Sequence, residues 1–177
     1  MAIEELVKVK APPAQPIHAG PIERWTEIEG TLGLKLPKDL YDFCLRYGSG
    51  KFGDTIRILN PFSGSYTDSI KEICSCYRDL RRDEGEGFVP HPVYPESPGL
   101  FPWGDDVNGH MMFWLTEGHP DQWPTILLTI DGQSERINST MTTFLAKSLS
   151  CEVSSVIWDD EWLRENAPHL DFIPARR

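Results

Sequence analysis

Long apolar runs are missing from this sequence of 177 residues. None of its segments approaches the roughly 18 to 20 consecutive apolar residues that a membrane-spanning helix requires. The sequence has no Gly-X-Y period and no sustained heptad, which excludes collagen and coiled-coil proteins. Acidic residues stand near the start, where a secretory signal would have basic ones. We therefore expect a cytoplasmic protein with no membrane partner.

Cysteine is scarce, and its spacing is irregular. Cys44, Cys74, Cys76 and Cys151 do not form the framework typical of small disulfide-rich proteins. Cys74 and Cys76 point to different sides of an expected helix, and no second Cys/His pair has the spacing of a zinc site. A chain of this length buries roughly 70% of its unfolded surface, so its core needs neither disulfides nor metal. We expect no metal and no cofactor.

Basic residues are rare in the second half of the chain. There are 11 acids and 12 bases up to Arg82, or +1, but 16 acids and 5 bases from Asp83 onward, or −11. The formal net charge of −10 thus arises in the second half. An acidic field repels nucleic-acid phosphates and speeds encounter with a cationic partner, so we expect no nucleic-acid partner. The alternative is that the acidic surface only keeps the protein soluble.

Catalytic signatures are weak. The segment 48–53, Gly-Ser-Gly-Lys-Phe-Gly, follows an expected helix and lacks the Gly-Lys-Ser/Thr ending of a phosphate loop, so we interpret it as a helix end followed by a flexible turn. No serine lies in a Gly-x-Ser-x-Gly nucleophile elbow. Asp105 and Asp106 could form an acid/base pair or bind a cation, but adjacent acids in a turn are usually solvated. We expect no catalytic residues.

Apolar residues that recur at spacings of three and four predict helices, and apolar segments between turn residues predict strands. The first helix runs from Pro21 to Gly33, with Trp25 inward and Glu29 outward. The other expected helices are 37–48, 67–82, 140–149 and 158–165, and the expected strands are 55–59, 110–116, 124–130 and 133–137.

The order of these elements indicates the fold class. Because helices come first and strands later, we expect an α+β fold, with the N-terminal helix pair packed on an antiparallel sheet and a C-terminal helix returning onto it. The sheet is expected from residues after Pro61. The proline-rich segment Ala-Pro-Pro-Ala-Gln-Pro predicts an N-terminal arm over 1–20, followed by a single domain over 21–177. The side chains expected in the core are Trp25, Phe43, Trp114 and Leu128.

Two sequence motifs, in the order in which they occur along the chain, resemble those of a known family. The first is the helix pair 22–43, with Leu-Gly-x-x-Leu-Pro between its helices, running into Tyr-Gly-Ser-Gly. The second is Phe-Pro-Trp-Gly-Asp-Asp-Val-Asn-Gly-His over 101–110, followed by Trp114 and then by Trp123-Pro. Over about residues 21–150, this order resembles the SUKH immunity-protein superfamily, whose relatives include the fungal cell-wall-synthesis regulators.

The resemblance implies a SUKH-like α+β fold without enzymatic activity, which in bacteria binds and neutralises a toxin, often a nuclease or deaminase domain. On this basis we expect a bacterial immunity protein that inhibits a cationic toxin domain by occlusion. The fungal members are regulatory interaction proteins, so a regulatory protein-interaction scaffold is one alternative. A small-molecule-binding or enzymatic domain that uses Trp103, Asp105 and Asp106 is the other.

The expected contacts with a protein partner combine acids with tryptophans that can serve as anchors. Trp103 and Trp123 stand beside Gly or Pro, which favours their exposure in loops. Trp158 and Trp162 adjoin acids near the end of the chain. The residues expected to bind the partner are Trp103, Asp105, Asp106, Asp159, Asp160, Glu161 and Trp162.

Overall fold

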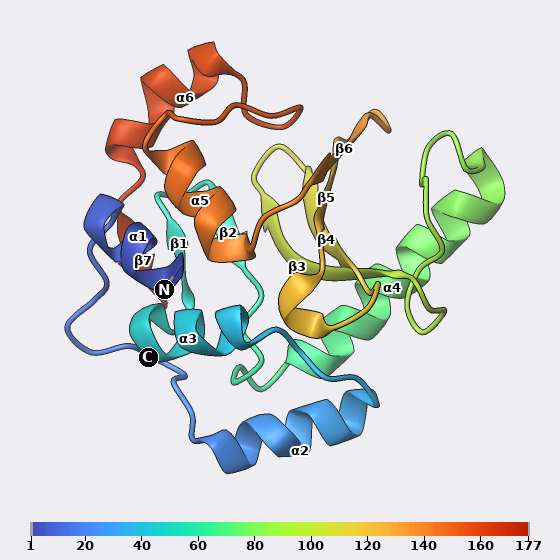
Figure 1. Cartoon of the computed structure of the whole chain (residues 1–177), viewed down its shortest axis with the longest axis horizontal. Coiled ribbons are helices and arrows are strands. Elements are labelled where there is room, and N and C mark those ends of the chain that lie inside the picture. Colours follow the sequence, from blue (N-terminus) through green and yellow to red (C-terminus); the bar gives the residue numbers. More distant parts are fainter. Residues whose placement is uncertain (1, 177) are drawn as a thin grey trace.

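A computed structural model describes residues 2–176, and the fold is α+β, as expected (Figure 1). The α-helices are α1 (Ala2–Val9), α2 (Ile22–Leu32), α3 (Lys38–Tyr47), α4 (Tyr66–Glu84), α5 (Met141–Leu149) and α6 (Asp160–Asn166). The 3-10 helices are η1 (Pro120–Gln122) and η2 (Ala167–His169). The strands are β1 (Gly50–Phe52), β2 (Ile56–Ile58), β3 (Leu100–Asp106), β4 (Met111–Leu115), β5 (Thr125–Leu128), β6 (Ser134–Ile137) and β7 (Phe172–Pro174).

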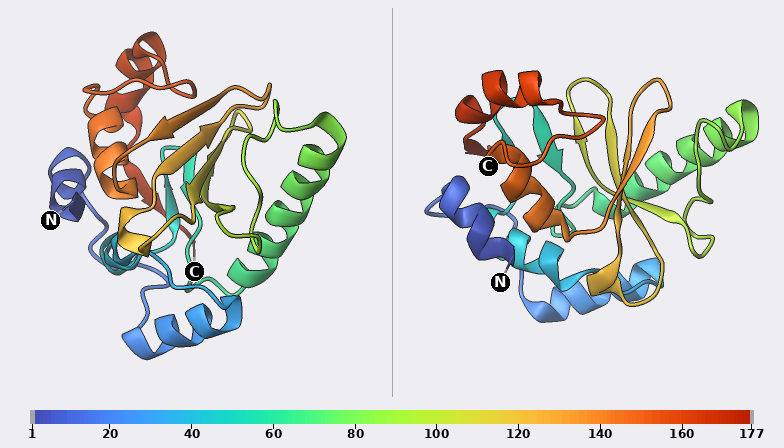
Figure 2. Two further views of the ribbon diagram at one scale, coloured as in Figure 1. Left: turned by 45° about the vertical axis from the view of Figure 1, so that its right-hand side comes forward. Right: turned by 45° about the horizontal axis from the view of Figure 1, so that its top comes forward.

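The strands form one sheet in the order β6-β5-β4-β3-β2-β1-β7, and each neighbouring pair is antiparallel. Helix α4 lies on one side of the sheet, and α5 lies on the other (Figure 2). Phe113 of β4 contacts Tyr77 of α4, with ring centroids 5.0 Å apart, whereas Trp103 of β3 contacts Phe144 of α5. The central strands β3 and β4 are therefore buried on both faces.

The two helices after the proline-rich segment end where the sequence predicts. Helix α2 ends at Gly33, where φ is 65°, and α3 ends at Gly48, where φ is 69°. Glycine adopts such positive φ angles at little cost, which explains both ends. Burial is confirmed for the side chains expected in the core, Trp25, Phe43, Trp114 and Leu128.

The strand expected over 55–59 is confirmed as β2, but the sheet is wider than expected, because β1 and β2, which precede Pro61, join it. Strand β1 lies in the segment 48–53, so the interpretation of that segment as a flexible turn was wrong. Strand β3 was not expected either, because Pro102 and Gly104 are unfavourable inside a strand. Here they flank an irregularity in the pairing of β3 with β4, which is where such residues are tolerated.

Glu29 was expected on the outer face of α2, but it is buried. Its Oε1 atom accepts hydrogen bonds from Trp25 Nε1 at 3.1 Å and from the backbone nitrogen of Leu36 at 2.9 Å. Its Oε2 atom lies 2.6 Å from Lys35 Nζ. These partners replace the water that the carboxylate loses on burial, so Glu29 fixes the connection between α2 and α3.

The first 20 residues contain a helix that was not expected in an arm. The proline-rich segment has no helix, but α1 before it packs on α5, with Ile3 and Leu6 buried. The hydroxyl of Tyr47 donates to the Lys10 carbonyl oxygen at 2.6 Å, and Lys10 Nζ donates to the Ala167 carbonyl oxygen at 2.7 Å. The start of the chain is thus tied to α3 and to the segment after α6.

Candidate protein-interaction surface

The hairpin turns after β1, β3 and β5 come together at one end of the sheet (Figure 1). The backbone nitrogen of Val107 donates to the Thr55 carbonyl oxygen at 2.9 Å, which joins the first two turns. The backbone nitrogen of Ile130 donates to His110 Nδ1 at 3.2 Å, which joins the second turn to the third. We call this region, made of turns 53–55, 107–110 and 129–133 with segment 153–161, the hairpin end.

Apolar side chains are exposed at the hairpin end. The exposed fraction is 70% for Val107, 66% for Ile130 and 39% for Val156. Ile130 lies against Gly109 of the neighbouring turn, and the backbone nitrogen of Val156 donates to Glu135 Oε2 at 2.9 Å. Exposed apolar side chains scattered singly are ordinary, but a group on adjoining turns indicates an interaction surface.

The hairpin end also carries acidic side chains. Asp131, Asp159, Asp160 and Glu161 are all exposed. The pKa of Asp131 lies below its ordinary value, because its carboxylate accepts hydrogen bonds from the Thr129 hydroxyl and the Gln133 side-chain amide. The surface therefore carries negative charge at neutral pH.

A buried tryptophan holds helix α6 at the hairpin end. The Trp158 ring is stacked between Phe144 of α5, at 5.7 Å, and Trp162 of α6, at 5.8 Å. Trp158 Nε1 donates to Asp106 Oδ2 at 3.1 Å, which links the segment before α6 to the end of β3. Asp159 caps α6, because its Oδ1 atom accepts from the backbone nitrogen of Trp162 at 2.8 Å.

The structure brings together four of the residues expected to bind a partner. Asp159, Asp160 and Glu161 are exposed at the start of α6, and Trp162 is half-buried beside them. Whether these residues contact a partner stays a prediction.

The other expected contact residues have different surroundings. Trp103 is fully buried in β3, and Trp123 is buried as well, so neither of these candidates for exposure in loops is exposed. Asp106 is buried at the end of the same strand rather than solvated in a turn. Asp105 forms an ion pair with Arg57 of β2, with Arg57 Nε 3.0 Å from Asp105 Oδ1. Asp105 and Asp106 thus hold elements together next to the hairpin end, and Trp103 and Trp123 belong to the core.

The apolar side chains of the hairpin end were missed by the sequence analysis. Val107 stands within Asp-Val-Asn-Gly, and Ile130 directly precedes Asp-Gly. Residues at the tip of a tight turn are exposed, whatever their polarity, because the chain reverses there at the surface. The sequence feature that indicates their exposure is therefore an apolar residue at a turn position that usually holds a polar one.

The cysteines occupy two kinds of environment. Cys44 and Cys74 are buried in the core, and burial raises the pKa of the Cys74 thiol to about 12. Cys76 and Cys151 are exposed. Over residues 2–176, no group of three or more His, Cys, Asp or Glu side chains is arranged to hold a metal ion. None of the helices in that range has both the length and the apolar character needed to span a membrane.

Most of the chain is similar to known proteins. The model of the SMI1/KNR4 family (SUKH-1) matches residues 21–147. Among solved structures, the chain is similar to a protein from Pseudomonas syringae pv. tomato at 20% sequence identity and a TM-score of 0.41, over 78% of this chain and 89% of that chain. No curated protein matches its sequence. Segment 153–161 and α6 lie beyond the residues that the family model matches.

Proposed function

Because the chain belongs to the SMI1/KNR4 family (SUKH-1), we propose that it is a non-enzymatic immunity protein that binds a cationic toxin domain through its hairpin end. This family includes immunity proteins, and its members typically bind partner proteins. The observation that carries the proposal is the joint exposure of Val107, Ile130 and Val156 among the acids of the same surface.

The two kinds of side chain have separate roles in such an interface. Apolar groups at its centre lose water on binding and slow dissociation. Acids at its rim attract a cationic partner and speed association, because electrostatic complementarity mainly affects the approach of the two proteins. A nuclease holds phosphates with Lys and Arg side chains, so an acidic surface seated on them would block its substrate. Such a complex would form in the cytoplasm, where a nuclease or deaminase toxin finds its substrate.

The alternatives differ in what they require of the molecule. A small-molecule or enzymatic site at Trp103, Asp105 and Asp106 requires free side chains, but two of these are buried and Asp105 is paired with Arg57. A regulatory scaffold uses the same kind of surface with a different partner, and gene neighbourhood separates the two roles. We expect a neighbouring reading frame that encodes a large secreted polypeptide with a polymorphic C-terminal domain. A metabolic operon in its place would contradict the immunity role.

Removing acids from α6 is expected to slow association with that toxin domain. In the variant Asp160→Asn/Glu161→Gln, the association rate at low ionic strength should fall about threefold to tenfold, with little change in dissociation. Asp159 is kept because it caps the helix. Binding kinetics at two salt concentrations provide the measurement. The matched control is Glu23→Gln/Glu27→Gln, which removes the same charge from the exposed face of α2. Equal slowing by both variants would contradict a role for the hairpin end.

Removing apolar side chains from the turns is expected to speed dissociation. The variant Val107→Ser/Ile130→Ser should dissociate about tenfold faster from the toxin domain, because these side chains lose their water on binding. Its folding should be unchanged, since both side chains are exposed in the free protein. Ile22→Ser on α2, also exposed, is the control for a general loss of surface apolarity. A dissociation rate equal to that of the parent would exclude these turns from the interface centre.

A further inference from the structure

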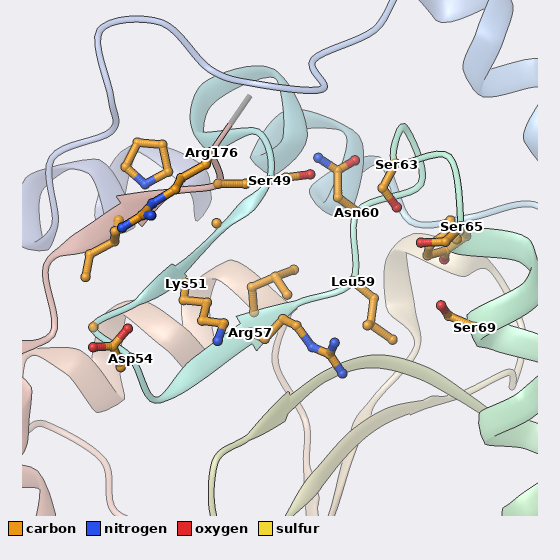
Figure 3. Close-up of a pocket in the computed structure, with 17 residues that line it drawn as sticks. Ser49, Lys51, Asp54, Arg57, Leu59, Asn60, Ser63, Ser65, Ser69 and Arg176 are labelled. Carbon is orange, nitrogen blue, oxygen red and sulfur yellow. The ribbon is translucent and has the colours of Figure 1, made fainter.

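A cleft of about 450 Å³ opens beside strands β1, β2 and β7 (Figure 3). One wall is formed by the strands, and the other by the segment before α4 and the first turn of that helix. Figure 3 shows Lys51 and Arg57 on the strand side and Ser63, Ser65 and Ser69 on the opposite side. The cleft is distinct from the exposed apolar residues of the hairpin end.

Strand pairing explains why this wall is polar. Lys51 of β1 pairs with Arg57 of β2 and with Ile173 of β7, so these three side chains lie on the same face of the sheet. The neighbours Phe52 and Ile56 alternate to the other face, where they are buried. The first face is left open here, and Lys51, Arg57 and Ile173 are exposed.

The cleft is basic, although the chain carries a net charge of −10. Lys51 has no ion-pair partner among the described side chains, and Arg176 lines the same cleft. Asp105 binds Nε and Nη2 of Arg57, which orients the guanidinium and leaves its Nη1 hydrogens available. Asp54, in the turn after β1, is the acid among the lining residues.

The other residues that line the cleft provide hydroxyl groups and apolar side chains. Ser63, Ser65 and Ser69 present hydroxyl groups across from the cations. Leu59, Ile173 and other apolar groups also line the cleft. Its volume lies within the range of about 300–1,000 Å³ that is usual for sites of small molecules. An amphipathic ligand therefore fits better than a bare ion.

We propose that this cleft binds a small organic phosphate. The phosphate lies between Lys51 and Arg57, which donate charge-assisted hydrogen bonds to it, and the serine hydroxyls bind its remaining oxygens. The carbon skeleton of the ligand lies on Leu59 and Ile173. A phosphate is favoured over a carboxylate because it has more acceptor oxygens for the donors of both walls.

The test uses 1-naphthyl phosphate as the probe, 1-naphthol as its neutral analogue, and amide chemical shifts in NMR titrations. The phosphate ester should shift the amides of 49–51, 57–59 and 63–69, and 1-naphthol should bind much more weakly. In Lys51→Glu, affinity for the ester should fall about tenfold, because an attraction is replaced by a repulsion. Lys8→Glu on α1 is the charge-matched control.

Three outcomes would overturn the proposal. Equal binding of 1-naphthol would show an apolar groove rather than a phosphate site. Shifts that lie elsewhere, or an equal loss of affinity in both lysine variants, would show that the probe responds to the overall charge of the protein. Thermal melts of the two variants establish that each is folded, and Lys51→Gln, which removes the charge without reversing it, should give an intermediate affinity.

Discussion

Replacing Trp103 with alanine is expected to lower the free energy of unfolding by about 3–5 kcal/mol, a large part of the stability of an ordinary domain. The Trp103 side chain is fully buried, and its ring lies 6.1 Å from that of Trp114 and 6.5 Å from that of Phe144. Its removal leaves a cavity between the sheet and α5 that these rings cannot fill. Urea denaturation followed by circular dichroism measures the loss.

The control for this variant is Trp103→Phe. Phenylalanine keeps an aromatic ring in the core and removes the Nε1–H group, which has no hydrogen-bond partner within residues 2–176. The loss should therefore be about 1–2 kcal/mol. An alanine variant that is as stable as the parent but dissociates faster from the toxin domain would restore Trp103 as a contact residue.

Replacing Asp106 with alanine is expected to lower the free energy of unfolding by about 3 kcal/mol, since it leaves several donors without an acceptor. Asp106 Oδ1 accepts from the backbone nitrogens of Asn108 at 2.9 Å and His110 at 3.1 Å. Asp106 Oδ2 accepts from Trp158 Nε1 at 3.1 Å. Chemical denaturation measures the stability, and hydrogen exchange should show faster opening in the turn and in α6 together.

Two neighbouring variants separate the parts of this network. Asp106→Asn keeps one oxygen, which can accept either from the backbone nitrogens of the turn or from Trp158 Nε1. Its amide nitrogen is a donor and cannot serve the other group, so an intermediate loss of stability is expected. Asp105→Asn breaks the partly exposed ion pair with Arg57 and should cost about 0.5 kcal/mol. A larger effect at Asp105 than at Asp106 would contradict the role that we assign to the buried carboxylate.

Local signals predicted the helices well and the strands unevenly. Gly33 and Gly48 mark helix ends because the conformation they adopt there is unfavourable for other residues. Strand β3 could not be predicted in this way. Its residues are buried on both faces, so they do not alternate, and Pro102 and Gly104 are tolerated only because of an irregular pairing with β4. Whether such an irregularity forms depends on a neighbouring strand, not on the local sequence.

The sequence predicted the acidic residues of the candidate surface but not the exposed apolar residues among them. Asp160 and Glu161 are exposed because they begin a short helix at the surface. Trp103 and Asp106 belong to a similar sequence pattern, an aromatic residue close to acids, but both are buried. Tertiary packing makes the difference, because α5 packs on Trp103 and Trp158 donates to Asp106, whereas no element covers Asp160 and Glu161 among the described residues. Sequence alone shows that acids and aromatics are adjacent, not which of them the fold encloses.

The end of the chain contributes to both proposed surfaces. The family model stops at residue 147, yet the chain beyond it supplies α6 to the hairpin end and Ile173 to the basic cleft beside β1, β2 and β7. Pairing of β1 with β7 joins this segment to the part of the fold that the family model matches, and the hydrogen bond from Lys10 to Ala167 joins it to the start of the chain. A substitution that displaces this segment should therefore alter the hairpin end and the cleft together.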